Sequence, residues 1–144
     1  MSAPDATDPA VAYTAEHRAI DAEIERFLDA PDDGAALRTA LDTLRRHIYL
    51  EEKFMFPPLR AAGLMMPIMV MIREHGELWR AMDAIEAGDP DPAACRELLR
   101  MLAVHNDKEE PIVYPQATEL DCAADLTELL TEAAMPDGWV CAAA

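Results

Sequence analysis

The chain has 144 residues, of which 51% are hydrophobic and 28% charged, and its formal net charge at pH 7 is −16. This composition is typical of a single globular domain with a hydrophobic core. The negative charge argues against nucleic acid or an anionic membrane surface as a partner, because surfaces that bind phosphate need clustered Lys and Arg. The longest apolar run, residues 63–72, is far shorter than the ~20 residues that a membrane span requires.

The N-terminus is polar and acidic, and it lacks the basic and apolar regions of a signal peptide. Three cysteines without a Cys-x-x-Cys pair suggest neither a disulfide framework nor a zinc ribbon, so we expect a cytoplasmic protein. Cys95 lies on an apolar helical stripe and is expected in the core. Cys141, near the end of the sequence, has a position compatible with exposure.

The first predicted helix begins at Pro9, because Asp8 is a suitable N-cap and proline favours the first helical position. It ends near residues 30–34, which form a turn-rich linker. A second helix follows, and we expect the proline pair at residues 57–58 to end it, since proline disrupts helical hydrogen bonding. Residues 59–63 would then form a connector.

The third predicted helix starts at residue 66 or 67 and ends at Ala87, before a glycine that suits a helix C-terminus. The fourth begins at Pro92, and Pro111 should disturb its last turn. A shorter fifth helix covers residues 122–134.

Four helices of about 20 residues joined by short linkers predict an all-α, up-down-up-down four-helix bundle with a short C-terminal fifth helix. We expect a single domain over residues 1–144, with the bundle core at about 9–116. The ends, residues 1–7 and 136–144, are expected to be loosely held and flexible.

The pattern His-x-x-x-Glu-Glu-x-x-x-aromatic-Pro occurs twice, at residues 47–57 and 105–115. On a helix, residues four apart share one face with their Cβ atoms about 5–6 Å apart, which is a spacing that metal ligands use. The pairs with this spacing are His47 with Glu51 and His105 with Glu109. The adjacent Glu52 and Glu110 turn about 100° away, so we expect them to orient or solvate the ligands rather than to bind metal.

The repeat extends beyond this motif, because the second half of the chain matches the first half after a shift of 58 residues. Glu16-His17 thus matches Glu74-His75, and all four histidines occupy equivalent places in two helical hairpins. Packed face to face, the hairpins would bring six side chains into one pseudo-symmetric core. These are His17, His47, Glu51, His75, His105 and Glu109.

A single histidine on an apolar stripe is usually an ordinary hydrogen-bonded core residue. Four imidazoles and two carboxylates together are different, because no Lys or Arg on the same stripes neutralises them and an unpaired buried carboxylate costs several kcal/mol. Two divalent cations remove that cost. Imidazole and carboxylate ligands suit iron, manganese or zinc, so we predict two iron ions as the first choice and zinc or manganese as the second.

Residues 51–57, 73–78 and 108–115 resemble signature segments of the hemerythrin-like family. The HHE cation-binding domains of that family carry a histidine, a His-x-x-x-Glu helix, another histidine and a second His-x-x-x-Glu helix. The resemblance spans about residues 10–120. It implies that the four histidines are iron ligands and that Glu51 and Glu109 bridge the irons.

The chain departs from the oxygen-carrying hemerythrins on the third helix, where they have a His-x-x-x-His pair. Met71 and Trp79 stand at the places four residues before and after His75, so one imidazole is missing. This resembles the subset with four histidines and two glutamates, which includes proteins that repair iron centres and iron-responsive sensors.

Two residues that flank His17 in the same way, Tyr13 and Asp21, are candidates for an additional ligand or for a hydrogen bond to a ligand. Ordinary packing is the favoured alternative for Tyr13, and a salt bridge with Arg18 is an equal alternative for Asp21.

The sequence is compatible with several functions. A di-iron protein that binds or senses O₂, NO or peroxide, or that handles iron, is the first hypothesis, since no nucleotide motif or second domain is evident. A di-iron oxidase, oxygenase or peroxide-consuming enzyme is the second, because the missing imidazole leaves a coordination position open. Iron donation or repair of iron centres is the third, and a structural metal is the fourth. From the sequence, any protein partner is unknown.

Overall fold

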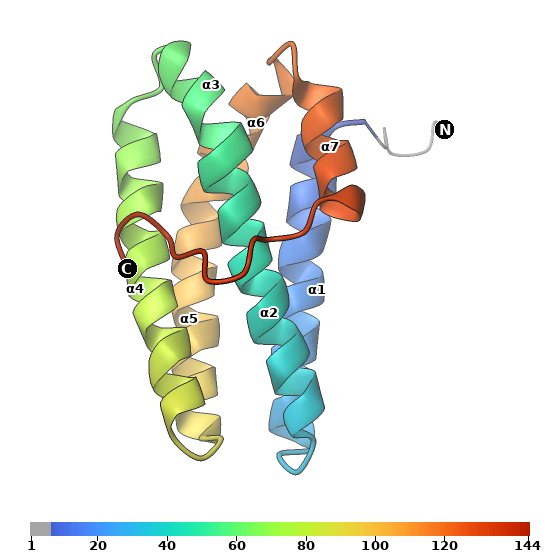
Figure 1. The fold of residues 1–144 in the computed structure, drawn as a ribbon, viewed down its shortest axis with the longest axis vertical. Coiled ribbons are helices and arrows are strands. Elements are labelled where there is room, and N and C mark those ends of the chain that lie inside the picture. The colour runs from blue at the N-terminus through green and yellow to red at the C-terminus, as the bar shows by residue number, and fades with distance from the viewer. Residues whose placement is uncertain (1–6) are drawn as a thin grey trace.

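A computed structural model of the chain describes residues 7–144, and Figure 1 shows two antiparallel helical hairpins lying side by side. Helices α1 (Pro9–Asp29) and α2 (Gly34–Leu50) form one hairpin, and α4 (Met66–Ala87) and α5 (Pro92–Lys108) form the other. The predicted all-α bundle is therefore confirmed. Residues 1–6, part of the N-terminal stretch expected to be flexible, lie outside the described residues.

The helix starts follow the predicted capping chemistry. The Asp8 carboxylate accepts a hydrogen bond from the Ala10 N–H at 2.9 Å, and the Asp91 carboxylate does the same for Ala93 at the start of α5. Each cap satisfies a backbone donor that has no partner within its helix, and a proline follows each cap directly. The two hairpins thus start from similar local signals.

The expected end of the second helix at residues 57–58 is wrong. The chain continues from α2 through a π-helical turn, η1 (Glu51–Met55), into α3 (Phe56–Ala61). In this turn the Phe56 N–H bonds to the carbonyl of Glu51, five residues earlier. The wider turn makes room for a proline ring that would clash with a regular α-helix.

The second hairpin repeats this arrangement. Helix α5 gives way to a π-helical turn, η2 (Glu109–Val113), and then to α6 (Tyr114–Thr118), so Pro111 disturbs the helix as predicted. Glu51 and Glu109 are the first residues of the two π-helical turns. Both side chains point into the bundle and are completely buried.

Apolar side chains form two layers, with the histidines between them. One layer, including Phe27, Leu41 and Met82, lies towards the hairpin loops. The other, including Met55 and Tyr114, lies towards α3 and α6. Among the described helices, none is long and apolar enough to cross a membrane.

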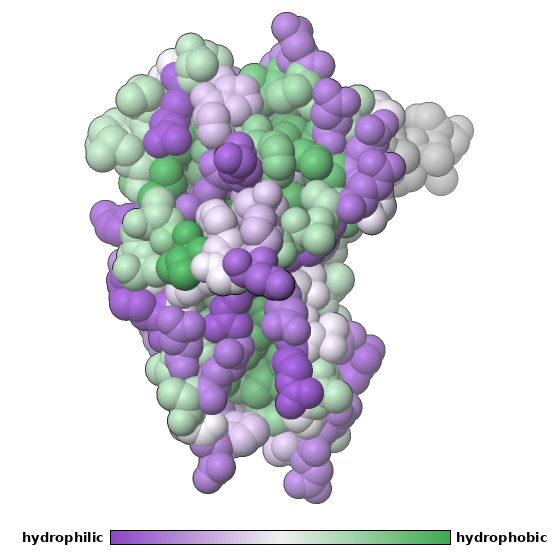
Figure 2. All heavy atoms as spheres, viewed as in Figure 1, coloured by the Kyte–Doolittle hydropathy of each residue, from purple (hydrophilic) through white to green (hydrophobic). Residues whose placement is uncertain are grey.

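The C-terminal part of the chain covers one face of the bundle. Helix α7 (Ala123–Glu132), slightly shorter than predicted, packs on α1 and α2, and residues 136–144 then cross α2 and end at α4 (Figure 1). Hydrophobic residues gather on the upper part of this face, around α7 and the crossing segment, whereas hydrophilic residues prevail below (Figure 2).

The expectation that residues 136–144 are loosely held is corrected by their packing. The Trp139 ring meets Tyr49 and Trp79 edge-on, with centroids 5.1 Å and 5.6 Å away. Cys141 is only 3% exposed, so its position near the end of the sequence does not expose it. Aromatic burial anchors a segment that has no helix of its own.

Candidate metal centre

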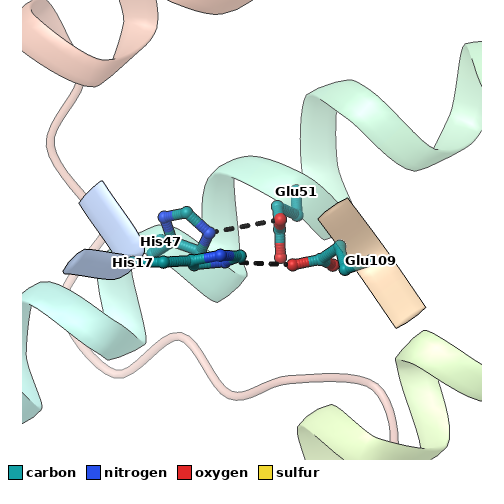
Figure 3. Close-up of side chains that lie close together, drawn as sticks. All are labelled: His17, His47, Glu51 and Glu109. Atoms are coloured by element: carbon teal, nitrogen blue, oxygen red, sulfur yellow. Dashed lines mark ion pairs between the residues drawn. The ribbon is translucent and has the colours of Figure 1, made fainter. Parts of the chain in front are cut away.

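Two groups of side chains converge between the apolar layers. The first cluster consists of His17 from α1, His47 from α2, Glu51 and Glu109. Figure 3 shows the two imidazoles facing the two carboxylates, with Nε2 of His17 3.1 Å from Glu109 Oε1 and Nε2 of His47 3.2 Å from Glu51 Oε2. One potential ligand atom from each residue lies within 4.8 Å of the others, which is compact enough to surround one metal ion.

The second cluster shares both glutamates and adds the imidazoles of the other hairpin, His75 and His105. Nε2 of His75 lies 3.1 Å from Glu51 Oε1, and Nε2 of His105 lies 3.4 Å from Glu109 Oε2. Each glutamate therefore presents one oxygen to each cluster. This is how carboxylates bridge two metal ions.

The outer nitrogen of every histidine is hydrogen-bonded to a further carboxylate, at 2.7–2.9 Å. The pairs are His17 with Glu110, His47 with Glu16, His75 with Glu52, and His105 with Glu74. An ionised carboxylate only accepts, so each Nδ1 carries the proton of its hydrogen bond, and Nε2 is the ring nitrogen that faces the cluster. The prediction that Glu52 and Glu110 orient ligands agrees with this geometry.

The charges of the bridging glutamates dominate the electrostatics of the metal-free centre. Burial lowers the pKa of His47, but the charge of Glu51 and hydrogen bonds to Glu16 and Glu51 outweigh it and raise the pKa to about 10. The same balance, with Glu109 as the main partner, raises the pKa of His105 to about 10. Without metal, the imidazoles of His47 and His105 therefore hold protons whose charge compensates that of the buried carboxylates.

Tyr114 is the residue of the centre that the sequence interpretation missed. Its hydroxyl oxygen lies 2.6 Å from Glu51 Oε2 and 2.9 Å from Glu109 Oε1. The same oxygen is 2.9 Å from Nε2 of His17 and 3.0 Å from Nε2 of His47. The phenol oxygen therefore lies among the four ligand atoms of the first cluster, so Tyr114 would be a fifth residue able to hold a cation there.

Burial, followed by the charges of Glu109 and Glu51, raises the pKa of Tyr114 well above its ordinary value in the metal-free protein. A cation between these groups would reverse that effect, because it favours the phenolate over the phenol. The sequence signal was available in the repeat, where Tyr114 stands opposite Phe56. The Phe56 ring stacks on His75 at 5.5 Å but has no oxygen to offer the second cluster.

The unpartnered atoms of the two clusters show that these residues fit a metal. Among the described residues, four buried side-chain atoms make no hydrogen bond, and three belong to the second cluster. They are Glu51 Oε1, His75 Nε2 and Glu109 Oε2. Although His75 Nε2 is 3.1 Å from Glu51 Oε1, the two atoms meet without hydrogen-bond geometry. Three buried oxygen and nitrogen atoms that lack hydrogen bonds and converge on one point are suited to bind a common cation.

Two other candidates stand outside the clusters. The Tyr13 hydroxyl donates to the Leu126 carbonyl at 2.9 Å, which ties α1 to α7. Tyr13 thus serves packing, with its ring edge-on to His47. Asp21 is half-buried, and burial raises the pKa of its carboxyl, partly offset by Arg18 and His17. It contributes no atom to either cluster.

The places of the missing imidazole are filled by apolar packing. Met71 is buried in the layer near α3, and Trp79 is buried against Trp139. A cavity of about 10 Å³ borders both clusters, lined by the four histidines, Glu51 and apolar side chains. Asn106, at 4% exposure, also lines it, and its Oδ1 has no partner among residues 7–144.

The fold and these clusters define a helical-bundle protein with a buried site for cations. Residues 8–117 match the hemerythrin HHE cation binding domain, and the chain belongs to this family. No curated protein and no solved structure matches the chain.

Proposed function

We propose that this protein binds two iron ions in the bundle core and uses them to bind a small ligand, such as O₂, NO or peroxide. The observation that carries the proposal is the pair of clusters joined by two shared carboxylates, with every imidazole fixed from outside by a further carboxylate. Imidazole and carboxylate donors suit iron, and iron supplies reversible binding or reduction of such ligands.

Each residue has a distinct role in this proposal. The first cluster would hold one iron through His17, His47 and Tyr114, and the second would hold the other through His75 and His105. The shared glutamates would bridge the two. The second position then has one protein donor fewer than the first, so the exogenous ligand would bind there.

The surroundings favour a small ligand over an organic substrate. The four histidines border a cavity of about 10 Å³, which is close to the minimum that holds one water molecule. Four apolar side chains line it beside the histidines and help to exclude bulk water, and Asn106 adds an amide. Because all six predicted ligands are at most 3% exposed, slow metal exchange is expected, which opposes the iron-donation alternative.

The test is metal analysis combined with optical spectra. Protein loaded with iron(II) without oxygen should hold two irons per chain and should change its visible spectrum on exposure to O₂, peroxide or NO. His75→Ala should hold at most one iron, whereas Asp21→Asn, a polar change outside both clusters, should still hold two. Binding of fewer than two irons by the parent protein would refute the proposal. Rapid catalytic loss of peroxide, absent in His75→Ala, would instead favour the enzyme.

A further inference from the structure

The outer carboxylates of the two hairpins are held in different ways. Beside His17, the Arg18 guanidinium of the first hairpin donates to Glu110 of the second at 2.7 Å, and Glu110 in turn holds Nδ1 of His17. The matching carboxylate in the other half is Glu52, which holds Nδ1 of His75. It pairs with no Lys or Arg in the described part of the chain. Its second oxygen instead accepts the backbone N–H of Ala142 at 3.0 Å.

The residue that matches Arg18 after the shift of 58 is Gly76. A glycine inside a 22-residue helix costs about 1 kcal/mol relative to alanine, so its presence needs a reason. The reason is space, because a Cβ on Gly76 would lie 2.3 Å from the backbone oxygen of Ala143. The C-terminal segment occupies the place where the first hairpin has an arginine side chain.

Other contacts fix the segment at this place. Arg80, one helical turn beyond Gly76, donates to the Ala143 carbonyl at 2.8 Å. The Trp139 ring packs between Tyr49 and Trp79, and the Cys141 side chain is buried against the bundle. Residues 139–143, which we call the C-terminal strap, are therefore held on both sides of the hydrogen bond to Glu52.

We propose that the C-terminal strap is a positioning element of the second cluster, which holds His75 through Glu52 as Arg18 holds His17 through Glu110. This rests on the proposed di-iron function. The strap acts through a neutral N–H rather than a cation, and it is a peripheral segment rather than part of a bundle helix. Displacing it should therefore weaken metal binding in the second cluster and leave the first cluster loaded.

Two variants break the chain of hydrogen bonds without changing a ligand. Gly76→Ala places a methyl group where the Ala143 backbone lies, while alanine favours the helix. Ala142→Pro removes the backbone N–H that donates to Glu52. In both, we expect affinity for one of the two irons to fall by about 10- to 100-fold, the usual effect of losing an outer partner of a metal ligand. Gly88→Ala, with open space around its Cβ, is the matched control.

Three measurements distinguish displacement of the C-terminal strap from a general loss of stability. Iron analysis in the presence of a chelator counts the retained metal. The visible charge-transfer band expected from a Tyr114 phenolate bound to iron(III) reports the iron of the first cluster. Labelling of Cys141 with a maleimide reports displacement of the strap in Gly76→Ala. Gly76→Arg should also expose Cys141 but should regain the second iron, since its guanidinium can take the part of Arg18.

Each outcome decides the matter. One iron lost with the Tyr114 band kept in both variants supports the inference, and recovery in Gly76→Arg strengthens it. Retention of both irons in Ala142→Pro at parental affinity overturns it. Equal loss of both irons also overturns it, because the effect would then be on the fold. If the parent protein itself binds fewer than two irons, the proposed function fails instead.

Discussion

Tyr114 and its counterpart Phe56 differ by one oxygen atom, and that oxygen lies within 3.0 Å of all four residues of the first cluster. Replacing Tyr114 by Phe should remove the visible charge-transfer band that a phenolate gives with iron(III). The remaining ligands should still retain two irons. Absorption and resonance Raman spectra of the oxidised protein measure the effect.

Tyr13→Phe is the control for this change, because it also removes one buried phenol oxygen. Its hydroxyl donates to the Leu126 carbonyl and belongs to neither cluster, so the band should persist and the free energy of unfolding should fall by about 1 kcal/mol. Loss of the band in Tyr13→Phe, or its survival in Tyr114→Phe, would contradict the assignment.

Asn106 should affect ligand affinity rather than metal content. It brings an unpartnered amide oxygen to the cavity beside both clusters, where the first hairpin has the apolar Ile48. Asn106→Leu should weaken binding of azide to the oxidised protein by about tenfold, since the amide, turned about its Cβ–Cγ bond, can donate its NH₂ to the anion, and a hydrogen bond to a charged group contributes about 1.5 kcal/mol. Optical titration measures the affinity.

Ile48→Leu changes the shape of the same cavity without a polar group, so its azide affinity should stay near that of the parent. Thermal unfolding of Asn106→Leu should show no loss of stability, because the substitution removes an unsatisfied buried group. Equal azide affinity in both variants would show that the Asn106 amide does not contact the ligand.

Sequence spacing was sufficient to find the six clustered side chains, because helical periodicity and the repeat place them on inward faces. It could not find the phenol oxygen. An aromatic residue at that position packs in the same way with or without a hydroxyl, and its distance from the cluster depends on the π-helical turn that precedes it. The metal-ligand assignments themselves stay predictions until metal is measured.

At the scale of elements, Arg46 fastens α7 to the bundle. Its guanidinium donates to the carbonyls of Leu129, Leu130 and Ala133 at 2.6–2.8 Å, which caps the end of that helix. Arg46→Ala should lower the free energy of unfolding by about 2 kcal/mol and should speed hydrogen exchange in α7. Urea denaturation and amide exchange provide the measurements.

Arg38→Ala is a matched control on the same helix, since Arg38 is exposed and stands away from α7. Its effect on stability should stay within about 0.5 kcal/mol. The assignment of Arg46 fails if the two variants behave alike.

The helices and their caps were predictable because local signals define them. The continuation of the second helix past residues 57–58 was not, because a π-helical turn admits proline where the general rule expects an end. The C-terminal strap was also missed, since its order comes from contacts between Trp139 and residues far away in the chain. Such contacts leave no periodic pattern in the sequence.

At the scale of the whole molecule, removing the metal should change how stability depends on pH. The pKa values of His47 and His105 rise from 6.5 to about 10 on folding, so the folded protein binds more protons than the unfolded chain between these values. Their contribution to stability is complete below about pH 6.5 and is lost as the pH rises towards 10.

Carboxylates set the acid side of this profile. The hydrogen bond to His105 lowers the pKa of Glu74 from 4.5 to about 2, so its contribution is lost as the pH falls through that interval. Metal-free protein should therefore be most stable between about pH 4.5 and 6.5, as urea denaturation after chelation would show. Iron-loaded protein should lack the decline above pH 6.5, because the metal displaces the imidazole protons. A rise in the stability of the metal-free protein from pH 6.5 to 9 would contradict this prediction.

The duplication has a consequence for electrons as well as for ligands. The residues that break the symmetry of the two halves are Tyr114 against Phe56, Arg18 against Gly76, and Asn106 against Ile48. An anionic phenolate stabilises iron(III) more than iron(II), so the first electron added to the oxidised centre should settle on the iron without it. The half-reduced protein should then show one trapped valence arrangement, seen as a single electron paramagnetic resonance signal, although its two halves share one sequence pattern.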